Sequence, residues 1–425
     1  MKSTERQPGH ESGLEQLDAR VWRSRLPGGT LVLSERMDSV RSVAIGFWFR
    51  QGTAHENADQ AGITHLLEHV VFKGTAHRTA HEIAVALERF GGSLDAFTTH
   101  EHTSFLAHVP ERAIGDAIDV LADLCFAPRL RASDVETERE VVLEEIARSE
   151  DTPEDIVFDL HADFLYDGHP YGSPILGTKE SVAGLGAGDL RRLHREAFTP
   201  GRLIVAAAGA VRHEELVASV SERLPAMPNG SAPWVQAPSR MASGLRRIER
   251  DGARQAHIVA GCPGVARGAP LRYAAILVDT AFGGGMSSRL FQRIREERGL
   301  AYSVYSFQAF YRRGGHLGAY VGTRPETSDA ARDLLLEEFG RLAESGLEPG
   351  ELETAREQLE GQLMLSLEAP AARMHRLAGI ALHDEPYRSL DEVARLVREI
   401  SAGDAAQAAA LHDPDRVAVL ELAPA

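Results

Sequence analysis

Two stretches of this chain are similar to each other and lie in opposite halves of it. ETEREVVLEEI at 136–146 and ETAREQLEGQL at 353–363 align without a gap at an offset of 217 residues. Both have the acidic, amphipathic pattern of a helix, so chance similarity between two such helices is the alternative explanation. Strand-like runs such as 43–49 and amphipathic stretches such as 112–126 alternate in a similar order in both halves. This order favours a duplicated α/β unit.

A linker-like stretch separates the two copies. PAMPNGSAPWVQAPSRMASG is rich in Pro, Gly, Ser and Ala, which is typical of a connection between domains. A chain of 425 residues is also too long for one hydrophobic core. The sequence therefore predicts a loose N-terminal arm at 1–20, a first α/β domain at 21–224, a linker at 225–244 and a second α/β domain at 245–425.

The first half contains the pattern His65-Leu66-Leu67-Glu68-His69. Two imidazoles four residues apart lie on one face of a helix, where both can bind one metal ion. The glutamate precedes the second histidine, which is the reverse of the commoner metallopeptidase order, and it supplies a nearby general base in either order. The alternative is a surface helix that carries two of the chain's 18 histidines by chance.

A second helix could complete such a site. The stretch 133–150 has a capping-box signature in Ser133 and Glu136 and places Glu138 and Glu145 on one face, two turns apart. One carboxylate oxygen would complete a His/His/Glu zinc site and leave the fourth position open for water. A salt-bridged surface helix explains the same pattern, so the residues alone leave the third ligand open.

The motif and its surroundings resemble a known family. GITHLLEHVVFKGT at 62–75 resembles the signature of the pitrilysin, insulinase and mitochondrial processing peptidase family of zinc peptidases. In that family the third ligand is a glutamate about 76 residues after the second histidine, which corresponds to Glu145, and a supporting glutamate corresponds to Glu138. Three further stretches are similar, at 91–105, 169–182 and 283–306. The resemblance extends over most of residues 20–420 and implies an α+β fold of two homologous α/β domains, each a mostly antiparallel sheet packed with helices.

The resemblance also assigns roles to residues outside the metal site. The stretch 91–105 is similar to the family's edge strand, which implies substrate binding by Asp95, Ala96, Phe97 and Thr98. Asp95 departs from the family's usual asparagine, and an aspartate at neutral pH only accepts hydrogen bonds. The stretch 283–306 is similar to the family's second-half signature, in which Arg295 and Tyr302 would assist catalysis. From the residues alone, a surface ion pair and an ordinary strand aromatic explain these two.

Together these expectations describe a zinc endopeptidase acting on short or unfolded peptides. One Zn²⁺ per subunit, held by His65, His69 and Glu145, would activate a water while Glu68 takes its proton. The resemblance implies a homodimer in which Arg295 and Tyr302 act in the partner's site. The alternatives are a peptide-binding homologue without catalysis, one subunit of a heterodimeric processing peptidase, and a structural metal protein.

Composition excludes other classes of function. A formal net charge of −16 opposes binding to nucleic acid or to an anionic membrane surface. The longest apolar run, at 203–211, is about half of the length needed to span a bilayer. The N-terminus lacks the apolar stretch of a secretory signal, so we expect a cytoplasmic protein. Cys125 and Cys262 form no disulfide framework and are expected in the core.

Overall fold

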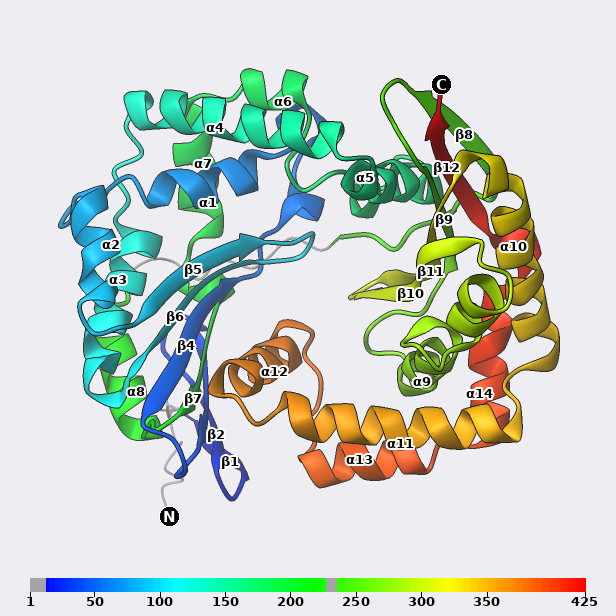
Figure 1. Ribbon diagram of the computed structural model, residues 1–425. Helices are drawn as coiled ribbons and strands as arrows, with labels where there is room; N and C mark the ends of the chain where they lie inside the picture. The colour runs from blue at the N-terminus through cyan, green and yellow to red at the C-terminus, as the bar shows by residue number, and fades with distance from the viewer. Residues whose placement is uncertain (1–12, 227–234) are drawn as a thin grey trace, which may run out of the picture.

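Two β-sheets, one in each half of the chain, form the framework of the protein, and helices pack around them (Figure 1). The computed structural model describes residues 13–226 and 235–425. The first sheet has the strand order β1-β2-β3-β7-β4-β6-β5. Its strands are β1 (Leu14–Asp18), β2 (Val21–Arg25), β3 (Leu31–Arg36), β4 (Ser42–Phe49), β5 (Ser93–Thr98), β6 (Thr103–Pro110) and β7 (Leu203–Gly209).

The second sheet repeats five of these positions. Its order is β10-β11-β9-β12-β8, with strands β8 (Gly244–Arg250), β9 (Ala256–Pro263), β10 (Ala301–Tyr311), β11 (Gly314–Thr323) and β12 (Ala418–Pro424). Each sheet contains one parallel pair, β3 with β7 and β12 with β8, and every other pair is antiparallel. Read in reverse, the second order is β8-β12-β9-β11-β10, which matches β3-β7-β4-β6-β5 of the first sheet. The parallel pair therefore has the same place in both sheets. The predicted fold of two homologous, mostly antiparallel α/β domains is confirmed.

Helices connect the strands in both halves. The first half contains α1 (Ile63–Val71), α2 (Ala80–Glu88), α3 (Ile114–Phe126), α4 (Ala132–Asp151), α5 (Pro153–Tyr166), α6 (Lys179–Ala183), α7 (Ala187–Ala197) and α8 (His213–Ser221). The second half contains α9 (Arg272–Gly283), α10 (Ser328–Ser345), α11 (Pro349–Ser366), α12 (Pro370–Leu382), α13 (Leu390–Arg398) and α14 (Ala402–Ala409). The two similar sequence stretches lie in α4 and α11, which supports the duplication.

The halves exchange one helix each. Helix α12 of the second half packs on β3, β4 and β7 of the first sheet, and α5 of the first half packs on β9 and β12 of the second (Figure 1). Met374 and Leu377 of α12 are buried in one apolar cluster with Trp48 of β4. On the other side, the His161 side chain of α5 lies 3.1 Å from the Ala418 carbonyl oxygen. Each half therefore completes the core of the other.

Two local expectations differ from the structure. Residues 1–12 of the predicted arm at 1–20 lie outside the described residues, but Leu14–Asp18 is not loose: it pairs with β2, and Arg23 binds Glu15 across the pair at 2.5 Å. The predicted capping box is also wrong. Helix α4 begins at Ala132 with Arg131 as its N-cap, so Ser133 already lies inside the first turn, and Arg131 pairs with Asp134 instead.

The remaining expectations concern the core and membrane spans. Cys125 and Cys262 are both fully buried, as expected. No helix within 13–226 or 235–425 combines the length and apolar character of a membrane span.

Candidate metal centre

Helix α1 presents both histidines to α4. Its apolar residues Ile63, Leu66, Leu67 and Val70 follow the i, i+3, i+4, i+7 pattern and are buried in the core of the first half. This burial fixes the rotation of α1 about its axis. His65 and His69 then lie one turn apart on the face that meets α4, with ring centroids 4.6 Å apart.

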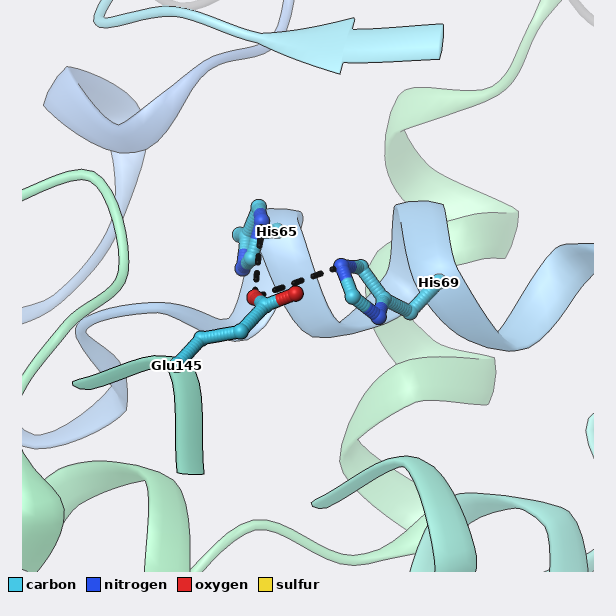
Figure 2. A group of neighbouring side chains, drawn as sticks. All are labelled: His65, His69 and Glu145. Atoms are coloured by element: carbon cyan, nitrogen blue, oxygen red, sulfur yellow. Dashed lines mark ion pairs between the residues drawn. The ribbon is translucent and has the colours of Figure 1, made fainter. Parts of the chain in front are cut away.

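Helix α4 brings a carboxylate to the same point. Val142 and Ile146 are buried, which fixes the rotation of α4 and places Glu145 beside them, toward α1. One Glu145 oxygen, Oε2, lies 3.9 Å from Nε2 of His65 and 3.6 Å from Nε2 of His69 (Figure 2). The ligand atoms of the three residues all lie within 4.8 Å of one another.

These distances fit a zinc ion. With ligand bonds of 2.0–2.2 Å, neighbouring ligand atoms of a tetrahedral zinc site are about 3.3–3.6 Å apart. The separation of 3.6 Å lies at the upper end of this range and that of 3.9 Å lies just beyond it, so a shift of a few tenths of an ångström would bring the Glu145 oxygen into place beside both imidazoles. Two imidazole nitrogens and one carboxylate oxygen form a donor set typical of catalytic zinc, which keeps a fourth position open.

Glu138 contacts His69 on the side of the ring that does not face Glu145. This carboxylate is 4% exposed, and its Oε2 is 3.4 Å from Nδ1 of His69, the nitrogen that does not face Glu145. Its Oε1 accepts from Lys73 Nζ at 2.7 Å. Partners of this kind fix the orientation and tautomer of a ligating histidine. Lys73 was not predicted, although its place four residues after His69, just beyond the end of α1, was a usable signal.

His65 has a different environment. Burial, together with the neighbouring His69, lowers the pKa of His65 to about 4, so its imidazole is neutral at pH 7 and free to bind a metal. Its Nδ1 is buried without a hydrogen-bond partner in the described part of the chain. His69 is therefore positioned by Glu138, whereas His65 is positioned by burial alone.

Glu68 has the environment of a general base. It is 8% exposed, and burial raises the pKa of its carboxyl above the usual value. The hydroxyl of Thr98, at the end of β5, donates to Glu68 Oε2 at 2.6 Å. That bond opposes the effect of burial on the pKa and fixes the carboxylate in place. Thr98 was predicted as a substrate-binding residue, and the structure shows its hydroxyl bonded to Glu68.

The Thr98 hydroxyl gives a prediction for the pH profile. Thr98→Val removes a hydrogen bond that favours the ionised form of Glu68, so the pKa of that carboxyl rises. The acidic limb of the pH profile of kcat/KM, measured for the peptide cleavage that the sequence predicts, should therefore move to higher pH. We expect about a tenfold loss of kcat/KM at pH 7, the usual scale for a charge-assisted hydrogen bond. Thr98→Ser should restore both the rate and the limb. A loss of rate that is equal at every pH would contradict this role.

Strand β5 is an edge strand beside α1 (Figure 1). Ala96 packs on the main core of the first half, while Asp95 is exposed and accepts from the Ala96 backbone N–H at 2.9 Å. The Phe97 ring lies 5.8 Å from His102 and 6.0 Å from His375 of α12. The second half of the chain therefore contributes a side chain next to this strand.

Arg295 and Tyr302 are close to each other but not to the three ligands. The Arg295 guanidinium lies 5.0 Å from the centre of the Tyr302 ring and 4.7 Å from that of Phe291. Tyr302, at the start of β10, is 77% exposed. Across the described ranges, no hydrogen bond, ion pair or ring contact joins either residue to His65, His69 or Glu145. Within one chain the structure does not bring the two groups together.

Known sequences and structures are similar to this chain over most of its length. Residues 31–179 match the sequence profile of insulinase, peptidase family M16, and residues 184–359 match that of the peptidase M16 inactive domain. An uncharacterized zinc protease of Mycobacterium leprae is 39% identical over 401 residues, which cover 92% of this chain and 90% of that protein. A protein of the same description from Bacillus subtilis is 36% identical, with 90% and 92% covered.

Solved structures support the fold. A peptidase M16 inactive domain from Pseudomonas fluorescens superposes with a TM-score of 0.89 at 20% identity, covering 95% of this chain and 98% of that one. A protease from Helicobacter pylori also gives a TM-score of 0.89, at 18% identity, with 95% and 99% covered. The repeated sheets, the sequence profiles and the extent of the similarity lead to one conclusion: this chain belongs to the insulinase family of peptidases, family M16.

Proposed function

We propose that this chain is a zinc-dependent endopeptidase that hydrolyses short or unfolded peptides. The observation that carries the proposal is the meeting of His65, His69 and Glu145 around one point, with the buried carboxylate of Glu68 on the same helix as the two imidazoles. The catalytic domain would extend over 21–224 and the second, metal-free domain over 245–425, joined by 225–244. Residues 227–234 of that linker lie outside the described residues.

The residues of the site have distinct tasks. A zinc ion held by the three ligands would lower the pKa of a water in its open position to about 7 and polarise the substrate carbonyl. Glu68 would take the proton of the attacking water and deliver it to the departing amine. Thr98 keeps that carboxylate directed toward the reaction, and Glu138 holds His69.

The edge of β5 offers a binding mode for peptides of varied sequence. An edge strand has unpaired backbone N–H and C=O groups, and an extended peptide can add to it as a further strand. Strand β5 ends at Thr98, which is bonded to the base, so a peptide along this edge would pass beside the metal site. The exposed Asp95 carboxylate accepts hydrogen bonds, so we propose that it contacts a substrate N–H group.

A digest of a peptide library by the purified chain tests this function. Fragments that form with the wild-type protein and not with a Glu68→Gln variant would support an endopeptidase. A library that stays intact with a zinc-loaded protein would contradict it and would favour the peptide-binding alternative.

We also propose a homodimer in which Arg295 and Tyr302 act on the partner's substrate. The Tyr302 hydroxyl would donate to the oxyanion, and the planar Arg295 guanidinium would bind a substrate carbonyl or carboxylate. The exposure of Tyr302 and its lack of contact with the three ligands of its own chain support action in the other subunit.

Mixed dimers test this arrangement. A Glu68→Gln chain mixed with a Tyr302→Phe chain should recover about one quarter of the wild-type activity, because half of the random dimers then contain one intact site. The reciprocal control is the double variant mixed with wild-type chain, whose mixed dimers should be inactive. Inactivity of the first mixture, with activity in the mixed dimers of the control, would show that Tyr302 acts in its own subunit.

A further inference from the structure

The backbone before α1 is in direct contact with the segment at 176–185. Gly62, the N-cap of α1, has φ +88°, and Gly177 has φ +77°. A Cβ atom on Gly177 would lie 2.4 Å from the Ala61 carbonyl oxygen, and one on Gly62 would lie 2.4 Å from the Leu176 carbonyl oxygen. The two backbone segments therefore approach so closely that only glycine fits on either side.

Hydrogen bonds reinforce this contact. The Ser181 hydroxyl donates to the Ala61 carbonyl oxygen at 2.8 Å. From the other side, the Glu56 carboxylate accepts from the backbone N–H of Gly62 at 2.8 Å and of Thr64 at 2.7 Å. These N–H groups lie at the start of α1, where no helical partner exists for them. The first turn of the helix, directly before His65, is thus held on both sides.

The same segment contacts the helix that carries the third ligand. Lys179 pairs with Glu150 of α4 at 2.5 Å, and Arg139 of α4 donates to the Leu185 carbonyl oxygen at 3.2 Å. Helix α6, which begins at Lys179, packs on α4. One short segment therefore contacts both helices of the metal centre, at points on either side of Glu145 in the sequence of α4.

We infer that residues 176–185 form a clamp that fixes α1 relative to α4 and so sets the separation of the two histidines from Glu145. This inference rests on the proposed zinc site. The fit of an ion depends on a few tenths of an ångström between the Glu145 oxygen and the two imidazoles, which no interaction within α1 alone can fix. Gly177 and Ser181 are positioning residues in this account and do not touch the metal.

Gly177→Ala tests the clamp against a matched control. Gly168→Ala, in the same half, has nearly the same backbone strain because its φ is +81°, but its added methyl group meets nothing within 4 Å. We expect zinc affinity, measured by competition with a chromogenic chelator, to fall about tenfold or more in Gly177→Ala and to stay within about twofold of wild type in Gly168→Ala.

A second readout needs no metal. In the zinc-free proteins, hydrogen exchange of the α1 amides should be about tenfold faster in Gly177→Ala than in Gly168→Ala, because the first turn is no longer held. Equal zinc affinity and equal α1 protection in the two variants would overturn the clamp. Faster exchange in Gly177→Ala, together with a zinc-loaded wild-type protein that cuts no peptide, would support the clamp and contradict the proposed function, so the two failures are distinguishable.

Ser181→Ala gives the test in case Gly177→Ala does not fold. It removes the hydrogen bond to Ala61 and also the bond that the Ser181 hydroxyl accepts from the Thr178 backbone N–H, so we expect about a threefold loss of zinc affinity. Its control is Ser366→Ala, which removes a comparable bond to the Leu363 carbonyl oxygen at the end of α11. Equal zinc affinity in these two variants and wild type would also contradict the clamp.

Discussion

Replacing Glu68 with glutamine is expected to lower kcat/KM for peptide cleavage by about 10²–10⁴-fold while zinc binding is retained. Glutamine keeps the size of the side chain and can still accept from the Thr98 hydroxyl, so the packing around α1 is preserved. It cannot take a proton from water at neutral pH. Glu68 is not among the three metal ligands, so zinc content measured by elemental analysis should stay at one ion per chain.

The control for this variant is Glu88→Gln, a change of the same kind on the exposed side of α2. It should cleave peptides at the wild-type rate. A Glu68→Gln protein that keeps more than about one tenth of the activity would exclude this carboxylate as the general base. If zinc and activity were lost together, the effect would be on the metal site and the assigned role would also be wrong.

Glu145→Ala should have the largest effect on metal binding. It leaves two imidazoles and no carboxylate, and three protein ligands are the usual number for catalytic zinc. We expect zinc affinity to fall by more than about 100-fold, the upper end of what loss of a supporting residue costs. Peptide cleavage should fall in parallel at limiting zinc. Isothermal titration of the metal-free protein measures the affinity, and circular dichroism checks the fold.

Glu144→Ala is the matched control, since it removes the neighbouring carboxylate on the same helix. Glu144 is exposed and is not among the three residues that meet at the site. Its replacement should leave the zinc affinity within about twofold of wild type, as is usual for surface changes. Equal affinities of the Glu144→Ala and Glu145→Ala proteins would show that Glu145 is not a ligand.

Parts of the fold follow from the sequence, and parts depend on distant contacts. The duplication was visible because α4 and α11 keep the same periodic pattern. The exchange of α5 and α12 between the halves was not, because an amphipathic helix shows which of its faces is buried but not which sheet covers it. Met374 and Leu377 would fit either core by composition, and only the structure shows them on the first sheet.

The candidate site also depends partly on local sequence and partly on tertiary structure. Helical spacing places His65 and His69 on one face of α1, and that needs no tertiary information. The choice between Glu138 and Glu145 does need it, because both lie on one face of α4 and the residues alone left the question open. The structure has Glu145 facing both Nε2 atoms and Glu138 facing Nδ1 of His69.

Contacts between distant segments could not be predicted from the sequence. The bond from Thr98 to Glu68 joins a strand to a helix 30 residues earlier, and neither residue has a pattern that points to the other. Gly177 was part of a stretch matched by resemblance, but its role depends on how close the backbone at Ala61 lies. Such contacts are set by packing of whole elements and not by local propensity.

The most direct test of the central claim is an X-ray structure of the zinc-loaded protein with anomalous data at the zinc edge. We predict one strong anomalous peak per chain, about 2.0–2.2 Å from Nε2 of His65, Nε2 of His69 and a carboxylate oxygen of Glu145, with one position left open. A peak at another place, or a Glu145 side chain turned away from an ion bound by the two imidazoles, would contradict the account.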